Sequence, residues 1–244
     1  MHGAKVTPAT VLSVKPSGEN NSSVCLLTRT EGVIYATLYG GPKSRLRSLV
    51  STWNTGNIWL SLSRNNYKIS DFDVKNYHLS FRENFYKSCA ASVSAELALK
   101  THCGGNNEKA WALINGFLTG LDRAADFSEC SSGFLRFLWR YLDLLGLQPD
   151  VSSCSFCSSK LYDSAHYIAS ENAFCGTCCH HEKSPFFLSR EAVLFLQGIT
   201  FLPPEEASGL SVQNQAYAEL KALIFYLIES ACGSPLFSLK AGDF

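Results

Sequence analysis

Five of the ten cysteines in this chain lie within one short segment, "CSFCSSKLYDSAHYIASENAFCGTCC". Two pairs share one spacing, with two residues between the cysteines: Cys154 with Cys157, and Cys175 with Cys178. Seventeen residues separate the pairs, and this pattern is typical of a four-cysteine zinc site. A two-residue turn lets two thiolates face one ion, so two such turns supply tetrahedral coordination. The pattern predicts one Zn2+ ion per chain.

Other interpretations of the segment are unrelated buried thiols, a redox pair or a disulfide knot. Cysteine is often buried, but two identically spaced pairs indicate one shared ligand set. A redox pair would require a βαβ context, and a reducing compartment disfavours disulfides. The fourth ligand stays open between Cys178, its neighbour Cys179 and the pair His180-His181. Cys178 keeps the two-residue spacing and is the expected ligand.

Four cysteine ligands would close the zinc shell, whereas a catalytic zinc ion keeps one position open. The zinc deaminase signature places H-x-E ahead of the cysteines, but here His180-His181-Glu182 follows them. The sequence contains no Walker lysine motif, no G-x-S-x-G and no H-E-x-x-H. We therefore expect a structural zinc ion, no catalytic residues and no small-molecule substrate. An enzyme such as a zinc nuclease or deaminase is the weakest alternative.

The expected secondary structure changes from strands to helices near Tyr77. Before it, short runs rich in Val, Leu, Ile, Thr and Tyr alternate with turn residues, which predicts about five strands in a small barrel. An OB-fold is the expected barrel, and an SH3-like barrel fits the same pattern. After it, Ser80 and Glu83 form a capping-box pattern that predicts the start of a helix. Further helical segments follow, and Gly146 is expected to end the helix before the cysteines.

The predicted fold class is therefore α+β, with a five-stranded OB-fold barrel followed by a helical domain. The expected domains are residues 1–79 for the barrel and 80–244 for the helical domain. A zinc-binding insert is expected at 150–185 within the helical domain. No apolar run reaches the roughly 18 residues of a membrane helix, and the first residues lack the pattern of a secretory signal. We expect a cytoplasmic protein without a membrane partner.

The charges are unevenly distributed, although the formal net charge is zero. Residues 1–80 hold nine Lys/Arg and four Asp/Glu, a net charge of +5, and the rest of the chain carries −5. Within the basic part, "GGPKSRLRSLV" places Lys43, Arg45 and Arg47 between the third and fourth expected strands. Alternate spacing would put all three on one side of an extended chain, where they could bind phosphates. A solvated loop is the alternative.

Aromatic residues near the basic segment could stack on bases: Tyr35, Tyr39, Trp53 and Trp59. Trp59 is more typical of a barrel wall. In the helix before the cysteines, Arg136 and Arg140 are four residues apart, so they share one face. These two arginines could extend a basic surface, or they could pair with Asp143 and serve a structural role.

The order of these parts resembles the bacterial recombination mediator family RecO over nearly the whole chain. The resemblance rests on the strand pattern, on "PKSRLRSLV", on "REAVLFLQGI" and, most specifically, on "FLRFLWRYLDLLGLQPDVSSCSFC". It implies an N-terminal OB-fold, a helical domain and a zinc module. It also implies DNA-binding roles for the basic residues of the loop and of the pre-zinc helix: Lys43, Arg45, Arg47, Arg136 and Arg140.

The function that the resemblance implies is mediation of DNA repair and recombination. Such a protein binds single- and double-stranded DNA and anneals complementary strands, including strands coated by single-stranded-DNA-binding protein (SSB). With RecR it promotes RecA loading in the RecF pathway, so RecF and RecA are indirect partners and the protein would associate with the nucleoid. Recognition of the SSB tail implies an apolar pocket rimmed by Lys or Arg, which is expected on the helical domain. The alternative function is a zinc-stabilised protein-interaction scaffold with little DNA affinity.

Overall fold

The computed structural model describes residues 5–41, 44–63, 66–178, 185–242 and 244. These residues divide into two compact units. Unit 1 contains residues 1–122 and 236–244, and unit 2 contains residues 123–235. The sequence-based division at residues 79 and 80 marks the change from strands to helices and stays a prediction. Within the described residues, no helix combines the length and hydrophobicity that crossing a bilayer requires.

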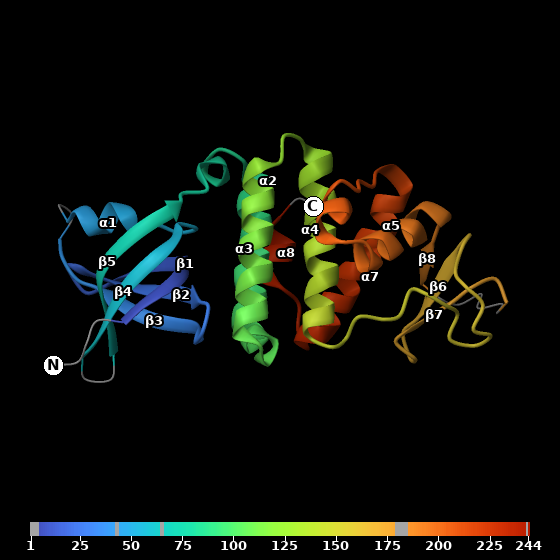
Figure 1. Ribbon diagram of the computed structural model, residues 1–244, viewed down its shortest axis with the longest axis horizontal. Helices are drawn as coiled ribbons and strands as arrows, with labels where there is room; N and C mark the ends of the chain where they lie inside the picture. Colours follow the sequence, from blue (N-terminus) through green and yellow to red (C-terminus); the bar gives the residue numbers. More distant parts are fainter. Residues whose placement is uncertain (1–4, 42–43, 64–65, 179–184, 243) are drawn as a thin grey trace. The chain divides into compact units, whose positions relative to one another are not determined.

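Unit 1 begins with a closed five-stranded barrel, drawn in blue to cyan in Figure 1. Its strands are β1 (Lys5–Ser17), β2 (Asn21–Thr28), β3 (Gly32–Leu38), β4 (Thr55–Ser63) and β5 (Asn66–Asn76). The order around the barrel is β1-β2-β3-β5-β4, and β1 also pairs with β4. The β3–β5 pair is parallel and the other pairs are antiparallel. The predicted α+β class with an OB-fold-like barrel is confirmed.

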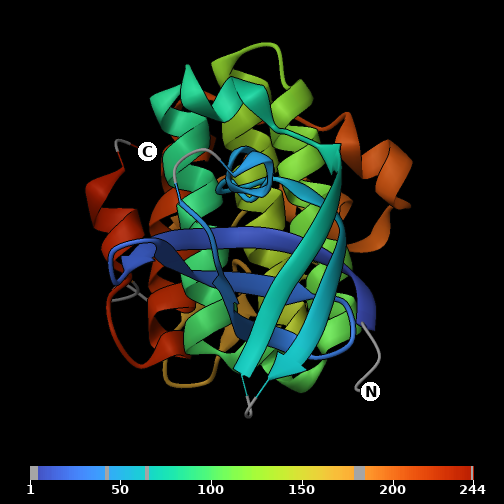
Figure 2. The same cartoon turned by 90° about the vertical axis from the view of Figure 1, so that its left-hand side faces the viewer.

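Alternation along the strands places one side chain in two inside the barrel. The inward residues form a continuous apolar core that includes Val11, Leu26, Leu38, Ile58 and Phe72, all buried. A five-residue helix, α1 (Arg45–Leu49), connects β3 to β4, and Leu46 and Leu49 from this helix pack against the core. Figure 2 shows α1 at one end of the barrel. The basic segment of the sequence is thereby attached to the barrel core.

The rest of unit 1 is helical. It comprises the short 3-10 helices η1 (Leu79–Arg82) and η2 (His102–Gly105), with α2 (Phe85–Lys100), α3 (Asn107–Arg123) and α8 (Phe237–Ala241). The last residue of α3 is the first residue of unit 2. The helix predicted to start with Ser80 as its cap starts later, because the side chain of Asn84 accepts the hydrogen bond from the Lys87 amide. Ser80 instead donates its hydroxyl to the Asp122 carboxylate at 2.6 Å. The predicted cap was therefore wrong by four residues.

The C-terminal helix α8 is attached to α2 through one carboxylate. Glu96 accepts hydrogen bonds from the backbone amides of Phe237 and Ser238, at 3.0 and 2.9 Å, and from the Ser238 hydroxyl at 2.6 Å. Lys100 lies 3.3 Å from the same carboxylate. Burial disfavours the Glu96 anion, but these donors outweigh it and hold the pKa below its ordinary value. Glu96 therefore supplies the first amides of α8 with an acceptor.

His78 is a buried histidine beside this helical part of unit 1. Its ring stacks on Phe81 with centroids 5.3 Å apart and planes at 11°, and its Nδ1 lies 3.6 Å from the Asp122 carboxylate. Burial lowers the pKa of His78, although Asp122 acts in the opposite direction. The folded protein therefore favours the neutral imidazole.

The pKa of His78 predicts a loss of stability in acid. The unfolded chain takes up a proton at the ordinary pKa of about 6.5, whereas the folded chain takes it up only at lower pH. The free energy of unfolding should therefore fall as the pH drops below about 6.5 and level off below the folded pKa. His78→Asn should flatten this dependence, because Asn does not titrate and tolerates the left-handed backbone of His78, φ 46°. Urea unfolding across this pH range measures it, and an unchanged slope in the variant would contradict it.

Unit 2 contains the helices α4 (Phe127–Leu144), α5 (Arg190–Phe201), α6 (Pro204–Ser208) and α7 (Asn214–Cys232). Helices α4 and α7 pack side by side (Figure 1). Gly146 follows the end of α4 as the expected C′ glycine and has φ 70°. The Gly146 amide donates to Asp143 O and the Leu147 amide to Leu142 O, both at 2.9 Å. This pair of bonds is the Schellman arrangement, and it turns the chain toward the cysteine segment.

Candidate metal centre

A three-stranded sheet of order β7-β6-β8 carries the cysteine segment in unit 2. Its strands are β6 (Ala165–Ile168), β7 (Ala173–Cys175) and β8 (Phe186–Leu188). The first cysteine pair lies in a loop closed by two backbone bonds, from the Cys154 amide to Ser159 O at 2.8 Å and from the Ser158 amide to Cys154 O at 2.9 Å. The second pair begins at the end of β7. The hairpin β6–β7 therefore connects the two cysteine pairs.

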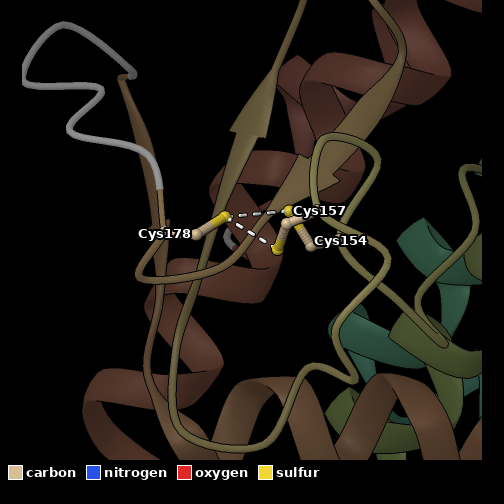
Figure 3. A group of neighbouring side chains, drawn as sticks. All are labelled: Cys154, Cys157 and Cys178. Carbon is tan, nitrogen blue, oxygen red and sulfur yellow. Dashed lines mark hydrogen bonds between the residues drawn. The ribbon is translucent and has the colours of Figure 1, made fainter.

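Four thiols converge at this place, and Figure 3 shows three of them pointing toward one another. The Cys178 sulfur lies 3.3 Å from Cys154 Sγ, 3.1 Å from Cys157 Sγ and 3.9 Å from Cys175 Sγ. Cys154 Sγ and Cys175 Sγ are 3.8 Å apart. A disulfide bond has sulfur atoms about 2.05 Å apart, so these four separations are those of free thiols. The disulfide interpretation does not fit them.

The sulfur positions fit a metal ion. Four ligands about 2.3 Å from a tetrahedral zinc ion lie about 3.8 Å from one another. The two separations that involve Cys175 are 3.8 and 3.9 Å, whereas Cys178 lies closer to Cys154 and Cys157, at 3.3 and 3.1 Å. The sulfur atoms of Cys154, Cys157 and Cys178 all lie within 4.8 Å of one another, and Cys175 adjoins this group through Cys154 and Cys178. Sulfur donors select zinc or iron–sulfur groups over magnesium or calcium. Cys154, Cys157, Cys175 and Cys178 therefore form a candidate metal centre in which Cys178 takes part. Cys179, His180 and His181 lie outside the described residues.

Backbone amides around the first cysteine pair favour thiolates. Burial would raise the pKa of Cys154, but the amides of Cys157, Gly176 and Phe156, with the Cys178 thiol, lower it to about 6. The hydroxyl of Ser159 and the Cys178 thiol lower the pKa of Cys157. Thiolates are the form in which cysteine binds metals. The lowered pKa values of Cys154 and Cys157 therefore favour the thiolate form, which binds metal ions.

The sheet of the cysteine segment is attached to the helices of unit 2 by aromatic and polar contacts. The ring of Phe186 lies 4.8 Å from that of Tyr226 on α7, and Tyr167 lies 6.1 Å from Phe186. Gln197 on α5 donates its side-chain amide to Val151 O and Leu161 O, at 3.0 and 2.8 Å. These contacts connect the cysteine segment to α5 and α7. Loss of the structure around the thiols would therefore remove packing and hydrogen bonds from both helices.

The basic segment of unit 1 has a different geometry from the expected one. Arg45 and Arg47 lie on the helix α1, where residues two apart point about 200° away from each other. They therefore do not share one side, and the extended conformation expected for them was wrong. Arg45 is exposed, and Arg47 is half-buried with its guanidinium donating to Ser22 Oγ on β2 at 3.2 Å. Lys43 lies outside the described residues.

Similarity to known proteins was found over most of the chain. Residues 82–240 match the profile of the family "Recombination protein O C terminal". The chain belongs to the RecO family. DNA repair protein RecO of Bacillus subtilis is 24% identical over 241 residues, covering 96% of this chain and 91% of that protein. The namesake from Bacillus pumilus is 23% identical, covering 94% and 90%, and that from Desulforamulus reducens is 27% identical, covering 77% and 73%.

Within the matched part of this RecO-family chain, Arg136 and Arg140 contact carbonyl oxygens. Arg136 Nη2 donates to Ser208 O at 3.1 Å and to Leu210 O at 3.0 Å, and Arg140 Nε donates to Ile199 O at 3.4 Å. Burial, with Arg140 nearby, lowers the pKa of the Arg136 guanidinium. These bonds connect α4 to the segments of α5 and α6, which favours the structural role for both arginines. Their contact with DNA stays a prediction.

Sequence reasoning missed several exposed cations in unit 1, on the barrel strands and in η1. Lys68 on β5 lies over the ring of Tyr39, 5.4 Å from its centroid, and Tyr39 is 50% exposed. Lys15 at the end of β1 and Arg82 in η1 are also exposed. Strand alternation could have indicated Lys68, because its neighbour Ile69 is buried in the core. No local signal connects Lys15 with Arg82, which are 67 positions apart.

Proposed function

We propose that this RecO-family chain binds single- and double-stranded DNA through the basic residues of its barrel and anneals complementary strands. The observation that carries the proposal is the contrast among the barrel cations. Three of them contact a carboxylate, in the pairs Lys5–Glu31, Arg29–Glu108 and Lys75–Asp73. Arg45 and Arg47 have no carboxylate within 4.0 Å among the described residues. Cations without an anionic partner are available to phosphates.

Annealing needs no catalytic residue. Two strands repel each other through their phosphates, and a protein that neutralises phosphates on both strands lowers this repulsion. Base pairing then supplies the free energy, since stacking contributes about 1.4 kcal/mol per step. We propose that the same chain acts on SSB-coated strands and, with RecR, promotes RecA loading in the RecF pathway. The names of the similar proteins support a repair role, and the pocket for the SSB tail stays a prediction for the helical domain.

We further propose that Cys154, Cys157, Cys175 and Cys178 hold one structural zinc ion. The convergence of the four thiols and the all-sulfur donor set support this proposal. Zinc has no redox chemistry of its own and would fix the two cysteine pairs to one another. The role of the ion in this proposal is to stabilise the segment between α4 and α5.

A fluorescence annealing assay with complementary oligonucleotides tests the function. Without ATP, the protein should raise the annealing rate on the order of 10- to 1,000-fold at low salt, because electrostatic steering has this range. SSB-coated strands should also be annealed, and less so when SSB lacks its tail. If the tail makes no difference, the SSB proposal fails. If bare strands are not annealed either, the alternative of a protein-interaction scaffold is favoured.

A further inference from the structure

Unit 1 contains a groove of about 700 Å3 between the barrel and α2. Strand β1 contributes Lys15, the segment after α1 contributes Trp53, and η1 contributes Phe81 and Arg82. Helix α2 contributes Ser88, Ser92 and Glu96 from one side of the helix. A ligand in this groove would contact two aromatic rings and two cations.

Trp53 is held in the wall of the groove by its backbone. Its φ of 73° is in the left-handed region, which a bulky residue rarely adopts. The Trp53 amide donates to Val11 O at 2.7 Å, and the Val11 amide donates to Asn54 O at 3.0 Å. The left-handed backbone of Trp53 is therefore stabilised by two hydrogen bonds with Val11 on β1, one from Trp53 and one to Asn54. Conformations of this kind concentrate at ligand sites.

The indole of Trp53 is half-buried and rests edge-on against Phe81, with ring centroids 6.3 Å apart and planes at 75°. Phe81 is itself buried and stacked on His78. The indole therefore has a fixed support and keeps part of its surface exposed. Base stacking on a protein requires such an aromatic ring.

The charges of the groove are positive. Lys15 and Arg82 are exposed, and Arg82 Nη2 donates to Ser51 Oγ at 3.5 Å. In the part of the chain that the structure describes, neither cation has a carboxylate within 4.0 Å. The one acidic side chain in the wall, Glu96, is occupied by the amides of α8 and by Lys100. An anionic ligand would therefore contact two cations, and the Glu96 carboxylate would repel it little because Lys100 and the amides of α8 already bind that carboxylate.

We propose that this groove holds one nucleotide of single-stranded DNA, with its base stacked on Trp53 and an adjacent phosphate bound by Arg82 and Lys15. This inference rests on the proposed DNA-binding function and assigns a second contact outside α1. The hydroxyls of Ser88 and Ser92 on the opposite wall suit a nucleotide better than an apolar side chain of a peptide. Moving a paired base out of its stack costs a few kcal/mol, whereas an unpaired base does not pay for unpairing, so the groove favours unpaired strands.

The test measures binding of an oligothymidylate of about 16 nucleotides, the upper site size of one OB-fold. Trp53→Ala should weaken binding about 5- to 150-fold, which is the range of one stacked base. Ser92→Phe, which leaves Trp53 in place and fills the groove from α2, should weaken binding in the same direction. Binding to duplex DNA, and to a strand of the same length without bases, should not change in either variant.

Three results would overturn the inference. The first is that both folded variants bind the oligothymidylate as tightly as the unaltered protein. The second is that they lose as much affinity for the strand without bases, since the ring would then not contact a base. The third is unchanged DNA affinity with a loss of binding to an acidic peptide ending in an aromatic residue. Failure of the proposed function differs from all three, because the unaltered protein would then bind no DNA.

Discussion

Protein purified without chelator is expected to carry one zinc ion per chain, and Cys175→Ser should release it. The expected effect on stability is large, because structural zinc supplies about 10–16 kcal/mol in small zinc-binding peptides. Without the ion, the loop of the first cysteine pair keeps only a few backbone bonds, each contributing about 1 kcal/mol. We therefore expect the cysteine segment to unfold and the helices α5 and α7 that contact it to lose stability.

Cys232→Ser is the matched control for this experiment, because Cys232 lies in the same unit at the end of α7 and outside the thiol cluster. It should keep the zinc ion and lose little stability. Metal analysis and thermal unfolding of both variants give the comparison. Zinc-free protein with unchanged unfolding would show that the thiols pack together without a metal ion.

A triple variant, Lys43→Ala with Arg45→Ala and Arg47→Ala, should weaken binding to all DNA sequences alike. Phosphate contacts carry no sequence information, and each contributes about 0.7 to the logarithmic salt slope on single strands. The slope should therefore fall by up to about 2. A salt titration of single-stranded DNA binding measures this change.

The ion pairs of the barrel provide a control of equal charge. Replacing the three paired cations Lys5, Arg29 and Lys75 by alanine removes the same three charges from the same part of the chain. Exposed ion pairs contribute about 0–1 kcal/mol each, so the control should fold. If both triple variants lower the slope equally, only the net charge matters, and the specific role of α1 is contradicted.

The parts of the structure that the sequence predicted are those that depend on local patterns. The spacing of the cysteine pairs requires only that each pair forms a tight turn, and the turn at Gly146 requires only a left-handed residue. The barrel was likewise predicted from a local pattern, short runs rich in Val, Leu, Ile, Thr and Tyr that are separated by turn residues.

The parts that could not be predicted depend on partners far away in the sequence. Ser80 fits a helix cap locally, but its hydroxyl is taken by Asp122, which is 42 positions away. The acceptors of Arg136 lie 72 and 74 positions away, in the segment around α6. The conformation of Arg45 and Arg47 depends on packing of α1 against the barrel core, which no charge pattern indicates.

The attachment of α8 to Glu96 makes unit 2 an insertion within unit 1. A ribosome completes every residue of unit 2 before it adds residues 236–244, which contribute the last helix of unit 1. During synthesis, the Glu96 carboxylate would therefore not yet accept hydrogen bonds from α8 and would keep Lys100 as a partner, while the cysteine segment already has all its thiols. Unit 1, although it begins the chain, can therefore be completed only after all of unit 2 has been synthesised.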